Sequence, residues 1–130
     1  ENHPEHAWKV VREIEIDTPG ALFVKTHDNS PWVWFDTPLS NEDEKTRRIC
    51  VYSKKEAKIE KCWMPFEQGR AVHFEYNKAG DEVWVSGWHK QGELVVYDDK
   101  TLEEKNRITG DWLVTPTGKF NVHNTAQDVY

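Results

Sequence analysis

The sequence lacks a long hydrophobic run. None of its 130 residues lies in an apolar stretch close to the roughly 18–20 residues that a membrane span needs. Hydrophobic residues make up 37% of the chain and charged residues 31%, a balance typical of globular rather than disordered proteins. Residues 1–6 are polar and form no signal peptide. We therefore expect no membrane partner. We also expect either that a leader has been removed from the chain or that the chain begins in the middle of a longer protein.

Clustered positive charge is also absent. The net charge is −6, and nucleic-acid binding needs grouped Lys and Arg side chains that neutralise phosphates. The densest basic pairs, Arg47-Arg48 and Lys54-Lys55, are typical of solvated strand ends and turns. No nucleic-acid partner is expected.

Motifs for common catalytic and metal sites are missing as well. The six histidines show no metal-ligand spacing, and there is neither a Gly-rich phosphate loop nor a nucleophile elbow. No CxxCH motif is present, so covalent attachment of a c-type haem is not expected. The sequence alone therefore indicates no catalytic residue and no metal ligand.

The two cysteines allow one structural hypothesis. A hairpin that turns about residue 56 places Cys50 opposite Cys62, because both lie six positions from the turn. Directly opposed positions on paired strands can meet the distance limits of a disulfide. We hypothesise a cross-strand disulfide.

No segment of helical length carries an apolar stripe of helical period, whereas short runs rich in Val, Ile, Trp, Tyr and Phe are frequent. Turn-forming residues separate these runs. The predicted strands are 21–26, 32–36, 47–53, 58–63, 71–76, 82–87, 93–98 and 103–108. The fold class is all-β.

A repeat organises these strands. Residues 21–24 resemble 71–74 and residues 33–36 resemble 83–86, each at an offset of 50, whereas 50–53 resemble 95–98 at an offset of 45. The difference lies in a loop, where true repeats vary in length. Four strands in about 45–50 residues match a propeller blade, which is stabilised by neighbouring blades.

We therefore predict a β-propeller fragment of about two four-stranded blades plus closing strands. Residues 1–20 would end a preceding blade, with residues 8–16 as its outer strand. The two blades would be 21–66 and 67–110, and 111–130 would hold a closing strand near 113–123.

The repeat gives single residues a position. The first strand of a blade lines the propeller axis, so Phe23 and His73 should lie on equivalent inner strands, with the turn at Thr117-Gly118 on a third. A flat cofactor could use an apolar ring, an imidazole and close backbone approach at Gly. A structural histidine that is merely hydrogen-bonded is the commoner alternative.

Other conspicuous residues suggest packing or solvation. Trp34 and Trp84 occupy matched places in second strands and should pack between blades. The acidic pairs Asp98-Asp99 and Glu103-Glu104 flank a predicted hairpin turn and should be solvated.

Long motifs now identify a resemblance. The runs 73–86 and 115–125, with His3-Pro4, 7–11 and 22–27 upstream, closely resemble the C-terminal part of the haem d1 domain of cytochrome cd1 nitrite reductases. The resemblance covers essentially the whole chain in order. It implies an eight-bladed propeller that carries non-covalent haem d1.

The family also implies a function. Its members are periplasmic homodimers that reduce nitrite to nitric oxide in denitrification and nitrate assimilation, with electron transport from a small cytochrome or cupredoxin. The remaining blades and a c-type haem domain would lie outside this chain. The positions of His73, Thr117 and Gly118 contact the haem d1 periphery in the family, and that of Phe23 adds an apolar contact. The family often has Gln where this sequence has His73.

None of the six histidines matches the family's iron ligand or its two distal histidines, so the segment alone is expected to be inactive. Two other functions stay open. One is a haem d1 maturation protein with the same propeller. The other is a non-catalytic propeller scaffold that docks a partner.

Overall fold

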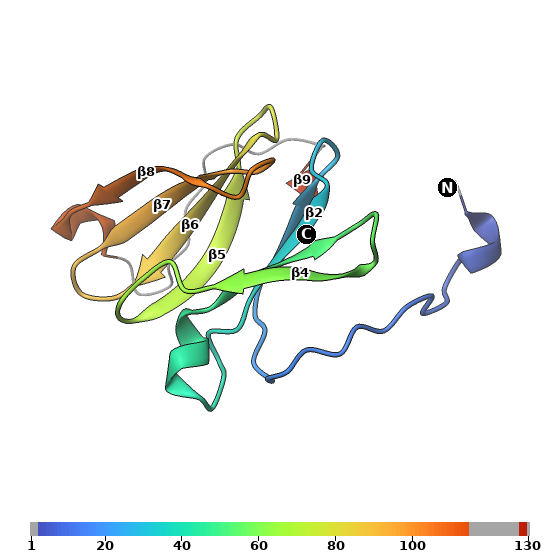
Figure 1. Cartoon of the computed structure of the whole chain (residues 1–130), viewed down its shortest axis with the longest axis horizontal. Helices are drawn as coiled ribbons and strands as arrows, with labels where there is room; N and C mark the ends of the chain where they lie inside the picture. The colour runs from blue at the N-terminus through green and yellow to red at the C-terminus, as the bar shows by residue number, and fades with distance from the viewer. Residues whose placement is uncertain (1–2, 115–127, 130) are drawn as a thin grey trace.

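Two antiparallel sheets, formed by strands consecutive in sequence, make up the computed structural model, which describes residues 3–114 and 128–129 (Figure 1). The first sheet has the order β4-β3-β2-β1-β9, and the second has the order β5-β6-β7-β8. The first contains β1 (Val24–His27), β2 (Trp32–Asp36), β3 (Ile49–Ser53), β4 (Lys58–Trp63) and β9 (Asp128–Val129). The second contains β5 (Arg70–Tyr76), β6 (Glu82–Trp88), β7 (Glu93–Asp98) and β8 (Glu104–Thr109).

The predicted all-β class and the repeat are confirmed, because each unit forms one four-stranded meander. Helical structure in the described residues is limited to three 3-10 turns, η1 (Pro4–His6), η2 (Asp43–Arg47) and η3 (Asp111–Leu113). None of the described helices is long and apolar enough to cross a membrane.

The main core lies where β1 and β2 meet β5, and it takes buried side chains from both sheets. Trp34 is fully buried there, with ring centroids 6.0 Å from Phe74 and 5.8 Å from Tyr97. Aromatic side chains of this size make some of the largest single contributions to a core. The predicted inter-sheet packing of Trp34 is confirmed.

Trp84 lies on a different face. Val83 and Val85 on either side of it enter the core, so the alternation of strand β6 turns the half-buried Trp84 away from the first sheet. Its predicted packing between blades is not seen among the described residues.

The prediction that both residues of the Asp98-Asp99 pair are solvated is wrong for Asp99, which is 2% exposed. Its Oδ1 accepts hydrogen bonds from Trp34 Nε1 (2.8 Å) and Tyr76 Oη (3.0 Å). Burial raises the pKa of the Asp99 carboxyl, opposed by these hydrogen bonds. Asp99 therefore joins the two sheets.

The basic pair Lys54-Lys55 is exposed, as predicted, whereas the expectation of solvation is wrong for Arg48, whose side chain is 13% exposed. Lys54 Nζ donates to the backbone oxygens of His27 (2.9 Å) and Ser30 (2.8 Å). Arg48 forms an ion pair with Asp17. These side chains hold loops in place.

The hypothesised disulfide is present. Strands β3 and β4 pair with Cys50 opposite Cys62, and the two sulfurs are bonded. The turn falls between Ser53 and Lys58, as the spacing of the cysteines predicted.

Three strand predictions need correction at the N-terminal side. Residues 8–16 form no strand, because no described strand lies beside them to exchange backbone hydrogen bonds. Most of them are exposed, and they contact the first sheet through side chains: Arg12 donates to Tyr52 Oη at 2.7 Å, and Ile16 packs against Phe35, Cys50 and Tyr52. Figure 1 shows the N-terminal segment that leads away from the sheets. Strand β1 begins at Val24 rather than 21, and β3 begins at Ile49 because Asp43–Arg47 form a 3-10 turn.

The described part of the closing strand predicted at 113–123 is residues 113–114, and it forms no strand. Leu113 ends the 3-10 turn η3, and residues 115–123 lie outside the described residues.

Candidate functional site

Phe23 and His73, the two matched positions of the repeat, lie together where the chain that enters β1 meets β5, a junction that we call the inner edge. Their ring centroids are 4.7 Å apart and the ring planes are tilted by 56°. Phe23 directly precedes β1, whereas His73 lies within β5. The predicted proximity of these residues is confirmed.

The Asp36 carboxylate ties these two segments together. Oδ1 accepts the backbone N–H groups of Leu22 (3.0 Å) and Phe23 (2.8 Å), and Oδ2 accepts that of His73 (3.1 Å). Asp36 is fully buried at the end of β2. Burial raises the pKa of its carboxyl, although the three N–H donors act in the opposite direction.

These hydrogen bonds explain why β1 begins late. The N–H groups of Leu22 and Phe23 are satisfied by a side chain instead of a neighbouring strand.

The backbone at His73 is unusual. Its φ is +70°, a left-handed conformation that costs a non-glycine residue roughly 1–2 kcal/mol. The pairing of β5 with β6 shifts register there, between Val72 and Phe74. A bulge redirects the side chain it carries, and the Asp36 hydrogen bond to the His73 N–H holds this conformation.

A buried chain of polar groups continues from the His73 ring. Nε2 lies 3.2 Å from Glu75 Oε1, and Glu75 Oε2 lies 3.4 Å from Lys25 Nζ. All three side chains are at most 4% exposed. The imidazole that contacts the Phe23 ring is thus followed by a buried carboxylate and a buried ammonium.

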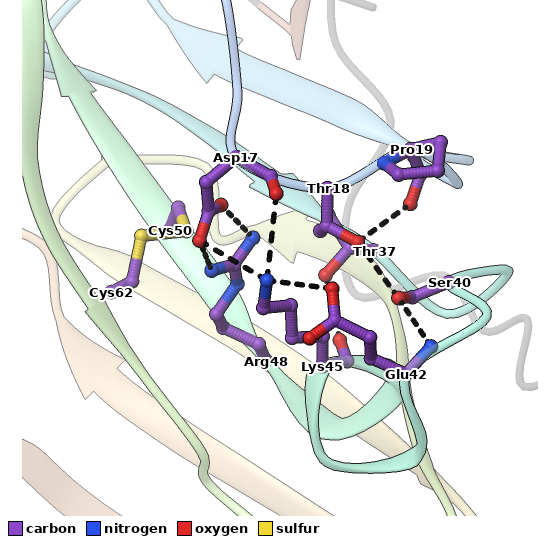
Figure 2. A network of polar contacts seen from close by, with 10 residues as sticks. All are labelled: Asp17, Thr18, Pro19, Thr37, Ser40, Glu42, Lys45, Arg48, Cys50 and Cys62. Carbon is purple, nitrogen blue, oxygen red and sulfur yellow. Dashed lines mark hydrogen bonds and ion pairs between the residues drawn. A yellow bond between two sulfur atoms is a disulfide. The ribbon is translucent and has the colours of Figure 1, made fainter.

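A second polar network fixes the segment that leads to Phe23 (Figure 2). Asp17 binds the Arg48 guanidinium through both oxygens, at 2.6 and 2.8 Å. This hydrogen bonding lowers the pKa of Asp17 to about 2. Lys45 links Asp17 to Glu42, at 3.5 and 2.7 Å. The β2–β3 loop therefore anchors the chain just before the site.

Close backbone contact completes this anchor. Thr18 Oγ1 lies 2.8 Å from Ser40 Oγ, and Leu39 N donates to Gly20 O at 3.0 Å. Gly20 has φ +100°, and a Cβ there would overlap the backbone of Leu39 and Ser40. Only glycine fits this approach without strain.

The other two predicted site residues, Thr117 and Gly118, lie outside the described residues. Sequence reasoning missed Asp36, Glu75 and Lys25. A buried carboxylate cannot be told from a solvated one by spacing, because its partners come from another part of the chain.

Two further features lie elsewhere. The exposed side chains of His3, Glu5 and His6 bring three possible metal-ligand atoms within 4.8 Å of one another. A separate hollow of about 1070 Å³ is lined by Phe66, His89 and Arg107, among others, and contains neither Phe23 nor His73.

Comparison with known proteins identifies the family. The model of the cytochrome D1 heme domain matches residues 1–125. The chain belongs to the cytochrome d1 haem domain family.

Two curated relatives share this sequence pattern. A nitrite reductase from Stutzerimonas stutzeri is 44% identical over 98% of this chain and 25% of its own length. A dihydro-heme d1 dehydrogenase from Pseudomonas aeruginosa is 35% identical over 90% of this chain and 22% of its own length. The chain thus spans about a quarter of these relatives.

A solved structure agrees. Dihydro-heme d1 dehydrogenase NirN in complex with DHE matches with a TM-score of 0.70 and 33% identity, over 79% of this chain and 21% of that one. The predicted fold class, two sheets of a haem d1 β-propeller, is confirmed. The finer boundaries at 1–20, 21–66, 67–110 and 111–130 stay a prediction.

Proposed function

We propose that this chain is the haem d1-binding part of a nitrite reductase that reduces nitrite to nitric oxide. The family match over residues 1–125 and the 44% identity to a nitrite reductase support this proposal. The observation that carries it is the junction of Phe23 and His73 at the inner edge, with ring centroids 4.7 Å apart.

The chemistry of this edge fits a flat cofactor that bears carboxylates. The Phe23 ring offers an apolar face, and the imidazole of His73 offers a hydrogen bond or a positive charge. Asp36 positions both residues through their backbone N–H groups. Thr117 and Gly118 would add contacts from the C-terminal segment, as the family resemblance implies.

When bound, haem d1 supplies the iron at which nitrite is reduced. The residues of this chain would orient the ring and exclude water from one part of its edge. We assign them no iron ligation and no proton transfer to nitrite, and the segment alone would therefore be inactive.

The remaining assignments follow from the same proposal. Other blades and a c-type haem domain would complete a periplasmic homodimer that takes part in denitrification, nitrate assimilation and electron transport. A small cytochrome or cupredoxin would deliver the electrons.

A second function has support of its own. The 35% identity to a dihydro-heme d1 dehydrogenase and the structural match to NirN favour a protein that acts on a haem d1 precursor. Such a protein would use the same inner edge to hold a tetrapyrrole without reducing nitrite.

Two assays on the intact protein separate these functions. The nitrite reductase proposal expects nitric oxide from nitrite and a reduced electron donor. The alternative expects oxidation of dihydro-haem d1 without nitric oxide. A protein that binds no tetrapyrrole in either assay would support the non-catalytic scaffold and contradict both.

A further inference from the structure

We propose that His3, Glu5 and His6 form a binding site for a divalent transition-metal ion such as Zn²⁺. These residues lie in and directly before the 3-10 turn η1, in the N-terminal segment that leads away from both sheets (Figure 1). None of them belongs to the candidate haem site, so the inference does not depend on the proposed function.

The turn brings the two imidazoles together. His3 directly precedes η1, and the backbone N–H of His6 donates to His3 O at 3.0 Å. A 3-10 helix has about three residues per turn, so side chains three positions apart project from the same side. The ring centroids of His3 and His6 are accordingly 5.9 Å apart, with the ring planes at 33°. Pro4 restricts the backbone between them. The turn thus gives this pair a geometry that the spacing in the sequence did not indicate.

The possible ligand atoms of the three side chains converge. Glu5 Oε1 lies 3.2 Å from His3 Nδ1 and 3.5 Å from His6 Nε2. One ligand atom from each residue lies within 4.8 Å of the other two. Because Zn²⁺ is about 2.0–2.2 Å from nitrogen and oxygen ligands, the ligand atoms of a tetrahedral site lie about 3.3 Å from one another. The two contacts of Glu5 already have this length, and a rotation of the exposed imidazoles can bring them to the same ion.

The donor set selects the class of metal. Imidazole nitrogen suits Zn²⁺, Ni²⁺ and Cu²⁺, whereas Mg²⁺ and Ca²⁺ prefer oxygen ligands throughout. Three protein ligands leave a fourth position for water. The side chains of His3, Glu5 and His6 are 75%, 60% and 54% exposed, so an ion can reach them from solvent. The nearby ammonium of Lys9 donates to the backbone oxygen of Glu5 at 2.9 Å, and the Glu5 carboxylate contacts the two imidazoles.

The test is calorimetric titration of the intact protein with Zn²⁺, repeated with Mg²⁺. The native protein should bind Zn²⁺ at this site and should bind Mg²⁺ much more weakly. Loss of a group that merely orients a metal ligand weakens metal binding about 10–100-fold, so loss of a ligand should weaken it at least about tenfold. We expect a loss of this size in His3→Ala and in His6→Ala. Glu5→Gln, which keeps the shape of the side chain but removes its charge, should also weaken binding.

A matched control comes from the same segment. Glu13 is also exposed, so Glu13→Gln removes one negative charge there without removing a proposed ligand and should leave Zn²⁺ affinity unchanged. Equal Zn²⁺ affinity in the native protein, His3→Ala and His6→Ala would overturn the inference. Binding of Mg²⁺ as tight as that of Zn²⁺, or an equal loss in Glu5→Gln and Glu13→Gln, would also overturn it, because either result indicates attraction of cations to an acidic surface.

Discussion

The substitution Asp36→Asn tests the link between the two inner segments. The shape of the side chain is kept, but only one of its two terminal atoms remains an acceptor. If the amide oxygen keeps the N–H groups of Leu22 and Phe23, the amide NH₂ faces the N–H of His73, and one hydrogen bond to a charged group is lost. Such a bond contributes about 1.5–3 kcal/mol.

We therefore expect Asp36→Asn to lower the free energy of unfolding by about 2 kcal/mol. The expected value lies in the lower half of the range of about 1.5–3 kcal/mol because burial of the native carboxylate is itself unfavourable, as its raised pKa indicates. A neutral amide avoids part of that unfavourable free energy. In urea denaturation followed by tryptophan fluorescence, the midpoint should fall by about 1 M.

Asp98→Asn is the matched control. Asp98 Oδ1 alone accepts the N–H groups of Lys100 (3.0 Å) and Thr101 (2.8 Å), so an amide oxygen can replace it. Its loss should stay below about 0.5 kcal/mol. Equal losses in the two variants would refute the bridging role of Asp36.

Three further predictions concern residues that hold the segments around the site in place. Gly20→Ala should destabilise the protein by more than about 1 kcal/mol, because its φ is +100° and a Cβ would meet the backbone of Leu39. Gly110→Ala is the comparison: the atoms nearest to a Cβ there belong to the exposed ring of Trp112, so this variant should cost less in the same denaturation assay. The Cys50–Cys62 disulfide links residues 12 positions apart, and its reduction should lower the free energy of unfolding by up to about 3 kcal/mol. A Cys50→Ser/Cys62→Ser variant as stable as the oxidised protein would contradict this prediction. In the folded protein the pKa of Asp17 is lowered to about 2, from about 3.8 in the unfolded chain. The contact with Arg48 therefore stabilises the fold fully above about pH 3.8, and this stabilisation is lost as pH falls through about 2. The loss should be small because Asp17 is 62% exposed, and Asp17→Asn should remove this part of the pH dependence of stability.

Turn-forming residues made the first and last residues of several strands predictable from the sequence. The strands at 32–36, 58–63 and 93–98 have the predicted bounds, because turn formers bracket each of them. The segment 8–16 shows the limit of such reasoning. Its composition favours a strand, but strand formation also needs a paired neighbour, which the described residues do not provide.

The repeat in the sequence made part of the candidate site predictable. The offset of 50 between matched segments placed Phe23 beside His73 without any knowledge of the structure. The buried charges could not be found in this way. Asp99 contacts Trp34 from 65 positions away, and Asp36 contacts His73 from 37 positions away. Burial of such groups depends on how the two sheets pack, which local patterns do not encode.

The amount of haem d1 that the intact protein retains after gel filtration tests the central claim most directly. The protein should retain the cofactor, and Phe23→Ala and His73→Ala should each reduce its occupancy. His89→Ala, which alters the separate hollow, should retain it as well as the unaltered protein does. Equal occupancy in all four proteins would show that the inner edge of β1 and β5 does not hold the cofactor.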